Sequence, residues 1–416
     1  MNATTLSRRQ ALISALGLGI TVEFVGGRAF AASQGAEAQK KLVVIICRGG
    51  LDGLTLSPPV GDPNYANLRG KIAVPGFGQP NGALKLDDTF GLHPSMTATY
   101  ALAQKGQARI IPAVATPDRE RSHFEAQDVL ESGAAVVYGT NSGWLNRAVA
   151  AMGPAGSVKA ISVGPTAPLI LRGPVEAASW SPGGAAETDH RLPGILMDLY
   201  RSDPLLGPAL ASGIATESMA KTATASVAMG GAGEPPPPVT AGNYARQGLP
   251  AARKLGATLA AFMTQPDGKQ VAAVSMDGFD SHANQAALLT TRLAYVDAFI
   301  DGLATGMGPA WNNTVVVVAT EFGRTAHVNG TAGTDHGTAS TALLIGGGLK
   351  KGGIVGGWPT LASNRLFENR DTAPTLDMRG VFKGVLRDHL GVDRAKLDST
   401  VFPSSGGVAP VAGMVA

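Results

Sequence analysis

The chain has 416 residues, of which 44% are hydrophobic and 16% are charged, so it can fold around a large apolar core. Its formal net charge of +3 is small for this length and no long lysine or arginine run occurs, which argues against nucleic-acid binding through phosphate neutralisation. The single cysteine excludes an internal disulfide and a zinc site built from several cysteines.

The first 31 residues have the three parts of a bacterial export signal. Arg8 and Arg9 form a twin-arginine pair, residues 11–25 are mainly apolar, and the sequence AFA at 29–31 is typical of a cleavage site. The apolar part is too short for a membrane-spanning helix. We expect the twin-arginine translocase to export the chain, residues 1–31 to be removed as a signal peptide, and the mature protein to be periplasmic or secreted without a stable membrane anchor. The alternative is an ordinary buried N-terminal helix.

Continuous apolar runs alternate with helical patterns along the rest of the chain. In chain order we expect strand 41–47, helix 96–104, strand 108–115, helices 122–132 and 144–152, strand 158–163, helix 243–263, strand 271–276, helix 285–307, strands 313–320 and 341–345, and helix 378–390. Strands made of unbroken Val/Ile runs are typical of a sheet covered on both faces. The pattern predicts an α/β fold, a three-layer sandwich whose mainly parallel central sheet has helices on both faces.

Two segments lack this alternation. Residues 174–242 are biased towards small residues and contain four successive prolines at 235–238, which favour an extended segment. We expect a flexible insertion or cap there, and a disordered tail at residues 404–416. The α/β domain is expected to span residues 32–403.

Candidate reactive side chains follow the predicted strands, where ligands bind in open α/β sheets. Asp52 follows the first strand and lies between glycines. Ser122 follows the second strand at the start of a helix, where the helix dipole favours an anion or an activated hydroxyl, and Arg121 is adjacent. Each has a simpler interpretation, Asp52 as a solvated turn residue and Ser122 as a helix N-cap.

Two Asp–His pairs and one glutamate lie at later strand ends. Asp280 and His282 are two positions apart, so in an extended loop they share a face and suit a divalent metal such as zinc or manganese. Glu321 follows a run of valines, where an unpaired charge is costly. Asp335 and His336 lie between glycines before the last strand. Capping or salt-bridged loops explain each alone, whereas together they predict a common polar or metal site.

Six motifs in fixed order resemble the bacterial family called domain of unknown function 1501. They are RGGLDGL at 48–54, RSHFEAQDVLESG at 121–133, GWLNR at 143–147, DSHANQ at 280–285, TEFGRT at 320–325 and GTDHGTA at 333–339. That family is similar to the alkaline phosphatase and sulfatase superfamily. Its members hold one or two divalent cations at the strand ends and attack a phosphate or sulfate ester with a Ser, a Thr or a modified Cys.

The resemblance implies a role for each candidate residue. Ser122 is the closest match to the nucleophile. Apart from the resemblance, the positive charges of Arg121 and Arg324 are expected to neutralise the transferred group. The implied metal ligands are Asp52, Asp280, His282, Glu321, Asp335 and His336, and the metal is zinc, manganese, magnesium or calcium. The chain departs from the superfamily pattern because Phe322 stands where a further ligand is usual and Ser122 lacks the usual short nucleophile motif.

These observations predict an exported metal-dependent hydrolase of phosphate or sulfate esters, with a small molecule or a polysaccharide ester as substrate. The alternative is a non-catalytic exported binding or assembly protein on a degenerate alkaline-phosphatase-like fold. A third hypothesis, a metal-free serine hydrolase using Ser122 or Ser281, lacks the G-x-S-x-G elbow.

Overall fold

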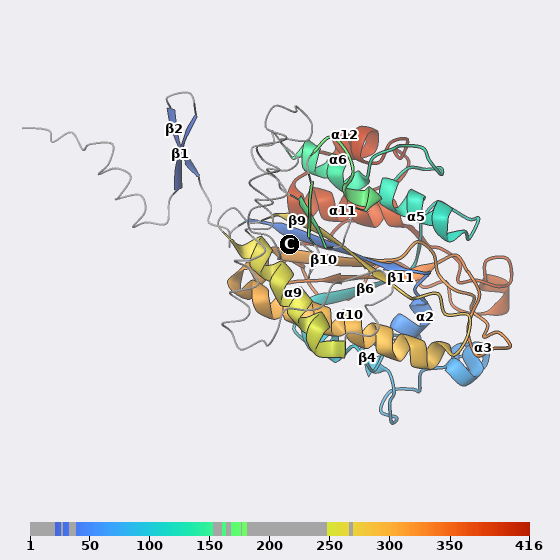
Figure 1. The fold of residues 1–416 in the computed structure, drawn as a ribbon. Coiled ribbons are helices and arrows are strands. Elements are labelled where there is room, and N and C mark those ends of the chain that lie inside the picture. The colour runs from blue at the N-terminus through green and yellow to red at the C-terminus, as the bar shows by residue number, and fades with distance from the viewer. Residues whose placement is uncertain are drawn as a thin grey trace, which may run out of the picture.

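The computed structural model describes residues 21–25, 28–32, 39–152, 160–163, 168–175, 177–180, 248–265 and 269–416. Its main sheet contains β3 (Lys41–Arg48), β6 (Ala108–Ala115), β7 (Ala160–Val163), β8 (Ala177–Trp180), β9 (Val271–Asp277), β10 (Thr314–Ala319), β11 (Ser340–Ile345), β12 (Gly353–Ile354) and β13 (Leu376–Asp377). The strand order is β12-β6-β11-β10-β3-β9-β7-β8, with β13 also paired to β6. Figure 1 shows this sheet at the centre of the molecule, between two groups of helices.

The helices of the described residues are α2 (Gly53–Leu56), α3 (Tyr65–Arg69), α4 (Thr97–Gln104), α5 (His123–Ser132), α6 (Trp144–Ala151), α9 (Gly248–Thr264), α10 (Gln285–Met307), α11 (Met378–Leu390) and α12 (Arg394–Lys396). Short 3₁₀ turns lie at Gly70–Ile72, Leu169–Leu171, Gly308–Asn313 and Ser363–Arg365, and a π-helical turn lies at Leu397–Val401. A small separate sheet pairs β4 (Leu84–Lys85) with β5 (Gly91–Leu92).

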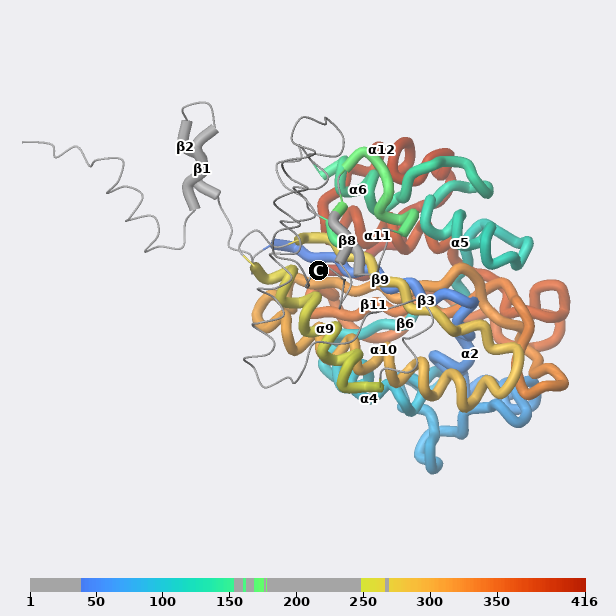
Figure 2. The backbone as a smooth tube through the Cα atoms, viewed as in Figure 1, coloured from blue at the N-terminus to red at the C-terminus, as the bar shows by residue number. Residues whose placement is uncertain are grey.

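The sheet buries both of its faces. In β3, Val43, Ile45 and Cys47 pack in the core cluster that contains residues of α9 and α10, whereas Leu42 and Val44 pack in the cluster that contains residues of α5, α6 and α11. Figures 1 and 2 show the two helical layers on opposite sides of the strands. Burial of successive side chains on opposite faces explains why the strand sequence is continuously apolar. The predicted α/β sandwich is confirmed.

All strand pairings in the main sheet are parallel except those of β11, which runs antiparallel to both β10 and β6. Consequently the carboxyl ends of β3, β6, β9 and β10 meet at one edge of the sheet, and β11 begins there. The loop between β10 and β11 therefore lies at the same edge as the loops that follow the other three strands.

The C-terminal residues pack against the domain, so the prediction of a disordered tail at 404–416 is wrong. Met414 and Val415 are buried, and Lys383 donates hydrogen bonds to the carbonyls of Ser405 (2.7 Å) and Val408 (2.9 Å). Arg109 donates to the carbonyl of Gly413 at 2.9 Å. Backbone carbonyls and two apolar side chains anchor the tail in spite of its small-residue composition.

Two other predicted segments are described in part. The predicted insertion at 174–242 includes β8, which pairs in parallel with β7, while residues 181–242 with their proline run lie outside the described residues. Within the predicted signal, β1 (Thr21–Val25) and β2 (Arg28–Ala32) pair antiparallel in a sheet of their own, and residues 1–20 lie outside the description. Among the described residues, the structure contains no helix with the length and apolarity needed to span a membrane.

Shortening the buried Met414 side chain tests the packing of the tail. We expect Met414→Ala to lower the free energy of unfolding by about 2–5 kcal/mol because it removes buried methylenes and leaves a cavity. Ala412→Ser, at an exposed position of the same segment, should change it by less than about 0.5 kcal/mol. Equal stabilities of the two variants in urea denaturation would mean that the tail frays.

Candidate metal centre

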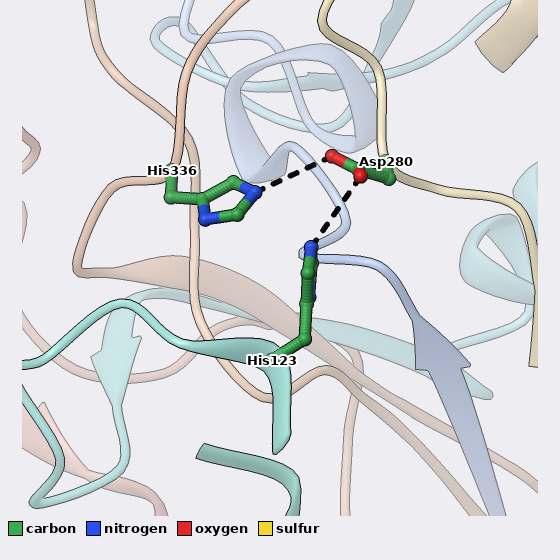
Figure 3. Close-up of side chains that lie close together, drawn as sticks. All are labelled: His123, Asp280 and His336. Carbon is green, nitrogen blue, oxygen red and sulfur yellow. Dashed lines mark ion pairs between the residues drawn. The ribbon is translucent and has the colours of Figure 1, made fainter. Parts of the chain in front are cut away.

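Three loops at the carboxyl edge of the sheet bring two histidines and an aspartate together. His123 is the first residue of α5, after β6, and Asp280 lies in the loop that follows β9. His336 lies in the loop between β10 and β11. One ligand atom from each of these three residues lies within 4.8 Å of the other two. We call His123, Asp280 and His336 the central triad, and Figure 3 shows both imidazoles pointing at the carboxylate.

Glycines allow these loops to approach one another. Gly49 has φ +112°, and a Cβ there would lie 2.5 Å from the backbone nitrogen of Asp280. A Cβ on Gly333 would lie 2.2 Å from the carbonyl of His282. Because real Cβ atoms do not approach backbone so closely, a side chain at either position would displace the loop that carries Asp280.

The two carboxylate oxygens of Asp280 face different partners. Oδ2 lies 3.5 Å from Nε2 of His123, and Oδ1 lies 3.4 Å from Nε2 of His336 and 3.0 Å from Nε2 of His282. The Asp280 side chain is 46% exposed, so solvent or a ligand reaches the site. His282 extends the triad because its Nε2 also lies 3.1 Å from Nε2 of His336.

Each imidazole is oriented through its other ring nitrogen. Nδ1 of His123 lies 2.8 Å from Oε1 of Glu321, and Nδ1 of His282 lies 3.1 Å from Oδ1 of Asp335. Nδ1 of His336 lies 2.8 Å from the carbonyl of Arg121. With acceptors at all three Nδ1 atoms, each neutral ring carries its proton there and presents the Nε2 lone pair to the site.

The donor set fits a divalent cation. Nε2 of His123 is buried and has no hydrogen-bond partner, which is costly for a polar atom unless a ligand occupies its lone pair. Imidazole nitrogens with a carboxylate suit zinc and manganese, and histidines held by a carboxylate or carbonyl at the far nitrogen are usual at such sites.

The surroundings shift the pKa values of His336 and Asp280 in the direction that favours metal binding, and the pKa of His123 in the direction that favours a competing proton. Hydrogen bonding to Glu321 raises the pKa of His123, while burial lowers the pKa of His336. Burial alone would raise the pKa of Asp280, but the hydrogen bond from Arg324 and nearby positive charge lower it overall. Asp280 is therefore an anion at neutral pH, as a metal ligand must be.

Glu321 lies beside the central triad and orients the ring of His123. Its buried carboxylate accepts hydrogen bonds from the amides of Gly49 (2.8 Å) and Gly50 (3.1 Å) and from the Thr320 hydroxyl (2.9 Å), in addition to its contact with His123. Burial opposes ionisation, but these hydrogen bonds, that from His123 first, lower the pKa of Glu321 overall. Glu321 and Asp335 were both predicted as metal ligands. In the structure Glu321 contacts Nδ1 of His123, and Asp335 contacts Nδ1 of His282.

Asp52 has partners different from those predicted. Its fully buried carboxylate pairs with Arg69, accepts hydrogen bonds from Thr55 Oγ1 (2.7 Å) and Gln285 Nε2 (2.5 Å), and caps α2 through the amide of Leu54. A carboxylate in a buried ion pair with these additional donors has little capacity left for a metal. The structure gives Asp52 the role of joining α2, α3 and the start of α10.

The two predicted arginines also have other partners. Arg324 is buried and donates to the carbonyls of Gly50 (2.9 Å) and Thr334 (3.1 Å) as well as to Asp280. Arg121 pairs with Asp371 and Glu368. Their guanidinium groups hold loops together, so neither is positioned as a free cation for a transferred group.

Ser122 is half-buried and immediately precedes α5, but its hydroxyl makes no capping hydrogen bond, so its side chain does not act as the N-cap of the simpler interpretation. Its neighbour Arg121 has φ +58°, a strained value for a residue with a side chain. The structure gives the central position to His123, to which the sequence analysis assigned no role. The signal was present, because His123 is adjacent to the predicted nucleophile within the same motif.

Replacing Asp52 with a neutral residue tests whether its carboxylate forms a structural ion pair or binds a metal. We expect Asp52→Asn to lower the free energy of unfolding by about 3–5 kcal/mol, because it leaves Arg69 buried without its counter-ion, and to leave zinc affinity unchanged. Asp280→Asn should do the reverse, weakening zinc binding with a smaller effect on stability. Urea denaturation and zinc titration measure both quantities, and a large loss of zinc affinity in Asp52→Asn would instead make Asp52 a ligand.

Comparisons with known proteins identify a sequence family and several distant structural similarities. The chain is similar to Ps i-CgsB in complex with k-i-k-neocarrahexaose (9% identity, 89% of this chain and 77% of that chain, TM-score 0.41). It is also similar to the alkaline phosphatase from the Antarctic bacterium TAB5 (13% identity, 76% and 94%, TM-score 0.33) and to the C-terminal periplasmic domain of EcEptC from Escherichia coli (10% identity, 90% and 89%, TM-score 0.36). No curated protein matches the sequence. A family model described as "Protein of unknown function (DUF1501)" matches residues 39–401, and the chain therefore belongs to the DUF1501 family.

Proposed function

We propose that the chain is a metal-dependent hydrolase of phosphate or sulfate esters whose cation is held by the central triad and His282. The observation that carries the proposal is the orientation of the histidines. Three Nε2 atoms surround one carboxylate, and each opposite nitrogen has an acceptor. A solvated cluster of ion pairs does not require every imidazole to be oriented in this way, whereas a metal site does.

The proposed cation is zinc or manganese, because imidazole is a good ligand for zinc, carboxylate is a good ligand for manganese, and the site contains only nitrogen and oxygen donors. When bound, such a cation acts as a Lewis acid that polarises an ester oxygen and lowers the pKa of a bound hydroxyl or water. The open side of Asp280 leaves room for a substrate group.

The residues of the chain supply positioning around that centre. Ser122 is the proposed nucleophile because it is adjacent to His123, at the amino end of α5, where the helix dipole stabilises negative charge. Arg121 contributes through its backbone, since its carbonyl orients His336. Arg324 keeps Asp280 ionised and directed at the histidines.

The alternative is a non-catalytic binding or assembly protein that keeps a structural cation. One observation favours it: the side chains of Arg121 and Arg324 are engaged by carboxylates and carbonyls. A phosphate or sulfate group would then depend on the cation and the end of α5 for charge neutralisation.

We also propose export by the twin-arginine translocase and a periplasmic or secreted location. The twin-arginine pair, the apolar segment and the small-residue cleavage sequence of residues 1–31 support this part of the proposal. A small-molecule or polysaccharide ester is the proposed substrate.

Turnover of aryl phosphate and aryl sulfate esters tests the proposed function. We expect hydrolysis that a chelator abolishes and zinc or manganese restores, because the cation supplies the main charge stabilisation. His123→Ala should lose both the metal and turnover. Ser122→Ala should keep its zinc affinity and lose turnover by about 100-fold or more, since it removes only the attacking hydroxyl.

His327→Ala is the matched control, because His327 is exposed on the same β10–β11 loop and lies outside the triad. It should retain both zinc affinity and turnover. Unchanged turnover in Ser122→Ala would remove Ser122 from the mechanism. A metal-loaded wild-type protein that hydrolyses neither ester would favour the non-catalytic alternative, and one that binds no divalent cation would contradict the proposed metal centre.

A further inference from the structure

A series of hydrogen-bonded side chains extends from the His123–Glu321 contact in the direction away from the central triad. Oε1 of Glu321, which faces His123, also accepts a hydrogen bond from Nε2 of Gln127 at 3.3 Å. Oε1 of Gln127 in turn accepts from Nη1 of Arg48 at 3.1 Å. Arg48 ends in an ion pair with Glu131 through its other terminal nitrogen. Four side chains therefore connect the ring of His123 to the interior of the protein.

The side chains of this series come from one face of α5 and from the ends of two strands of the main sheet. His123, Gln127 and Glu131 are spaced four residues apart on α5, so they lie one above the other on the same face. Arg48 is the last residue of β3, and Glu321 comes two residues after the end of the neighbouring β10. Hydrogen bonding along this face therefore ties α5 to the carboxyl edge of the sheet.

The donor and acceptor properties of the side chains determine the direction of each contact. Arg48 can only donate, so the oxygen of the Gln127 amide must face it. The amide nitrogen of Gln127 is then left to donate to Glu321, which is a carboxylate and accepts. Neither leucine nor glutamate could replace glutamine here, because leucine makes neither contact and glutamate would place a second carboxylate against Glu321.

Glu131 and Arg48, at the end of this series of hydrogen bonds that is farthest from His123, are also held by several contacts. Glu131 is buried, and its second oxygen accepts a hydrogen bond from the amide of Ile170 at 3.0 Å. Arg48 uses its two terminal nitrogens on two different acceptors, Gln127 and Glu131. A planar guanidinium can hold both at once, whereas a lysine ammonium at the end of a flexible stem cannot reproduce that fork.

We infer that Gln127 and Arg48 are positioning residues that set the affinity of the metal centre by fixing Glu321 and, through it, the imidazole of His123. The inference rests on the proposed function, since it requires that His123 binds a cation. Residues that orient a metal-binding histidine from behind commonly change metal affinity by about 10–100-fold when they are replaced.

Zinc affinity measured by competition with a chromophoric chelator tests the inference. Gln127→Met keeps the length of the side chain and removes both hydrogen bonds, and Arg48→Lys keeps the charge and removes the fork. We expect each to weaken zinc binding by about 10-fold, the lower end of that range, because Glu321 keeps its backbone donors. Gln127→Asn, which is one methylene too short to bridge, should resemble Gln127→Met and serves if that variant fails to fold.

The double variant identifies the mechanism. If Arg48 acts through Gln127, Gln127→Met with Arg48→Lys should weaken zinc binding no more than the stronger single variant does, whereas independent effects would multiply to about 100-fold. The visible absorption of the Co²⁺-loaded protein gives a second readout, since it reports ligand geometry. We expect it to change in both single variants and to stay unchanged in Glu125→Gln, a control on the same helix outside this chain of contacts.

The outcomes separate the inference from the proposed function. A wild-type protein that binds zinc, with Gln127→Met and Gln127→Asn binding it equally tightly and showing an unaltered cobalt spectrum, would overturn the inference and leave the metal centre standing. Multiplied effects in the double variant would overturn the relay through Gln127. A wild-type protein that binds neither zinc nor cobalt would overturn both the metal centre and the inference.

Discussion

Glu321 is a carboxylate buried at the end of the apolar strand β10, and its charge must be balanced without water. The amides of Gly49 and Gly50, the hydroxyl of Thr320 and the ring of His123 surround it, and these contacts outweigh the effect of burial on its pKa. Each donor comes from a neighbouring piece of the carboxyl edge, so satisfying one charge draws the ends of β3 and β10 and the start of α5 together. The direction in which His123 points follows from that requirement.

Three further buried charged side chains, Arg324, Asp52 and Arg69, lie at the same edge of the sheet. Arg324 connects the glycine turn after β3, the loop before β11 and Asp280, while Asp52 and Arg69 join the helices that follow β3 to the start of α10. These are structural contacts of charged side chains at a site that also has a polar, solvent-accessible centre. The division is physical: fully buried charges hold the loops, and the half-exposed Asp280 with its histidines is left to bind a ligand.

The sheet and the long helices could be predicted from sequence because their signals are local. Residues 285–307 and 378–390 form α10 and α11 with the expected bounds, and the valine run near residue 316 is β10. The antiparallel direction of β11 could not be predicted, because a strand buried on both faces has the same apolar sequence in either direction. The packed tail was missed for a related reason: its small residues resemble a loose segment, and only distant partners such as Lys383 and Arg109 anchor it.

At the site, sequence reasoning identified the strand-end loops, and the contacts decided the part each side chain plays. Asp280, His282 and His336 do lie together, whereas Asp52 faces an arginine that is 17 residues away in sequence. A carboxylate ligand and a carboxylate in an ion pair look alike in sequence, because the difference depends on which cation lies opposite. The same holds for His123, whose importance depends on the unpartnered Nε2 that faces Asp280.

The central claim is that one divalent cation binds between the central triad and His282, and anomalous X-ray diffraction from crystals grown with zinc tests it most directly. Data collected on both sides of the zinc absorption edge locate bound zinc without reference to activity. The account predicts an anomalous peak within bonding distance of a carboxylate oxygen of Asp280 and of Nε2 of His123, His282 and His336, roughly 2.0–2.2 Å from each. A well-ordered site without such a peak, or a peak held by other residues, would contradict it.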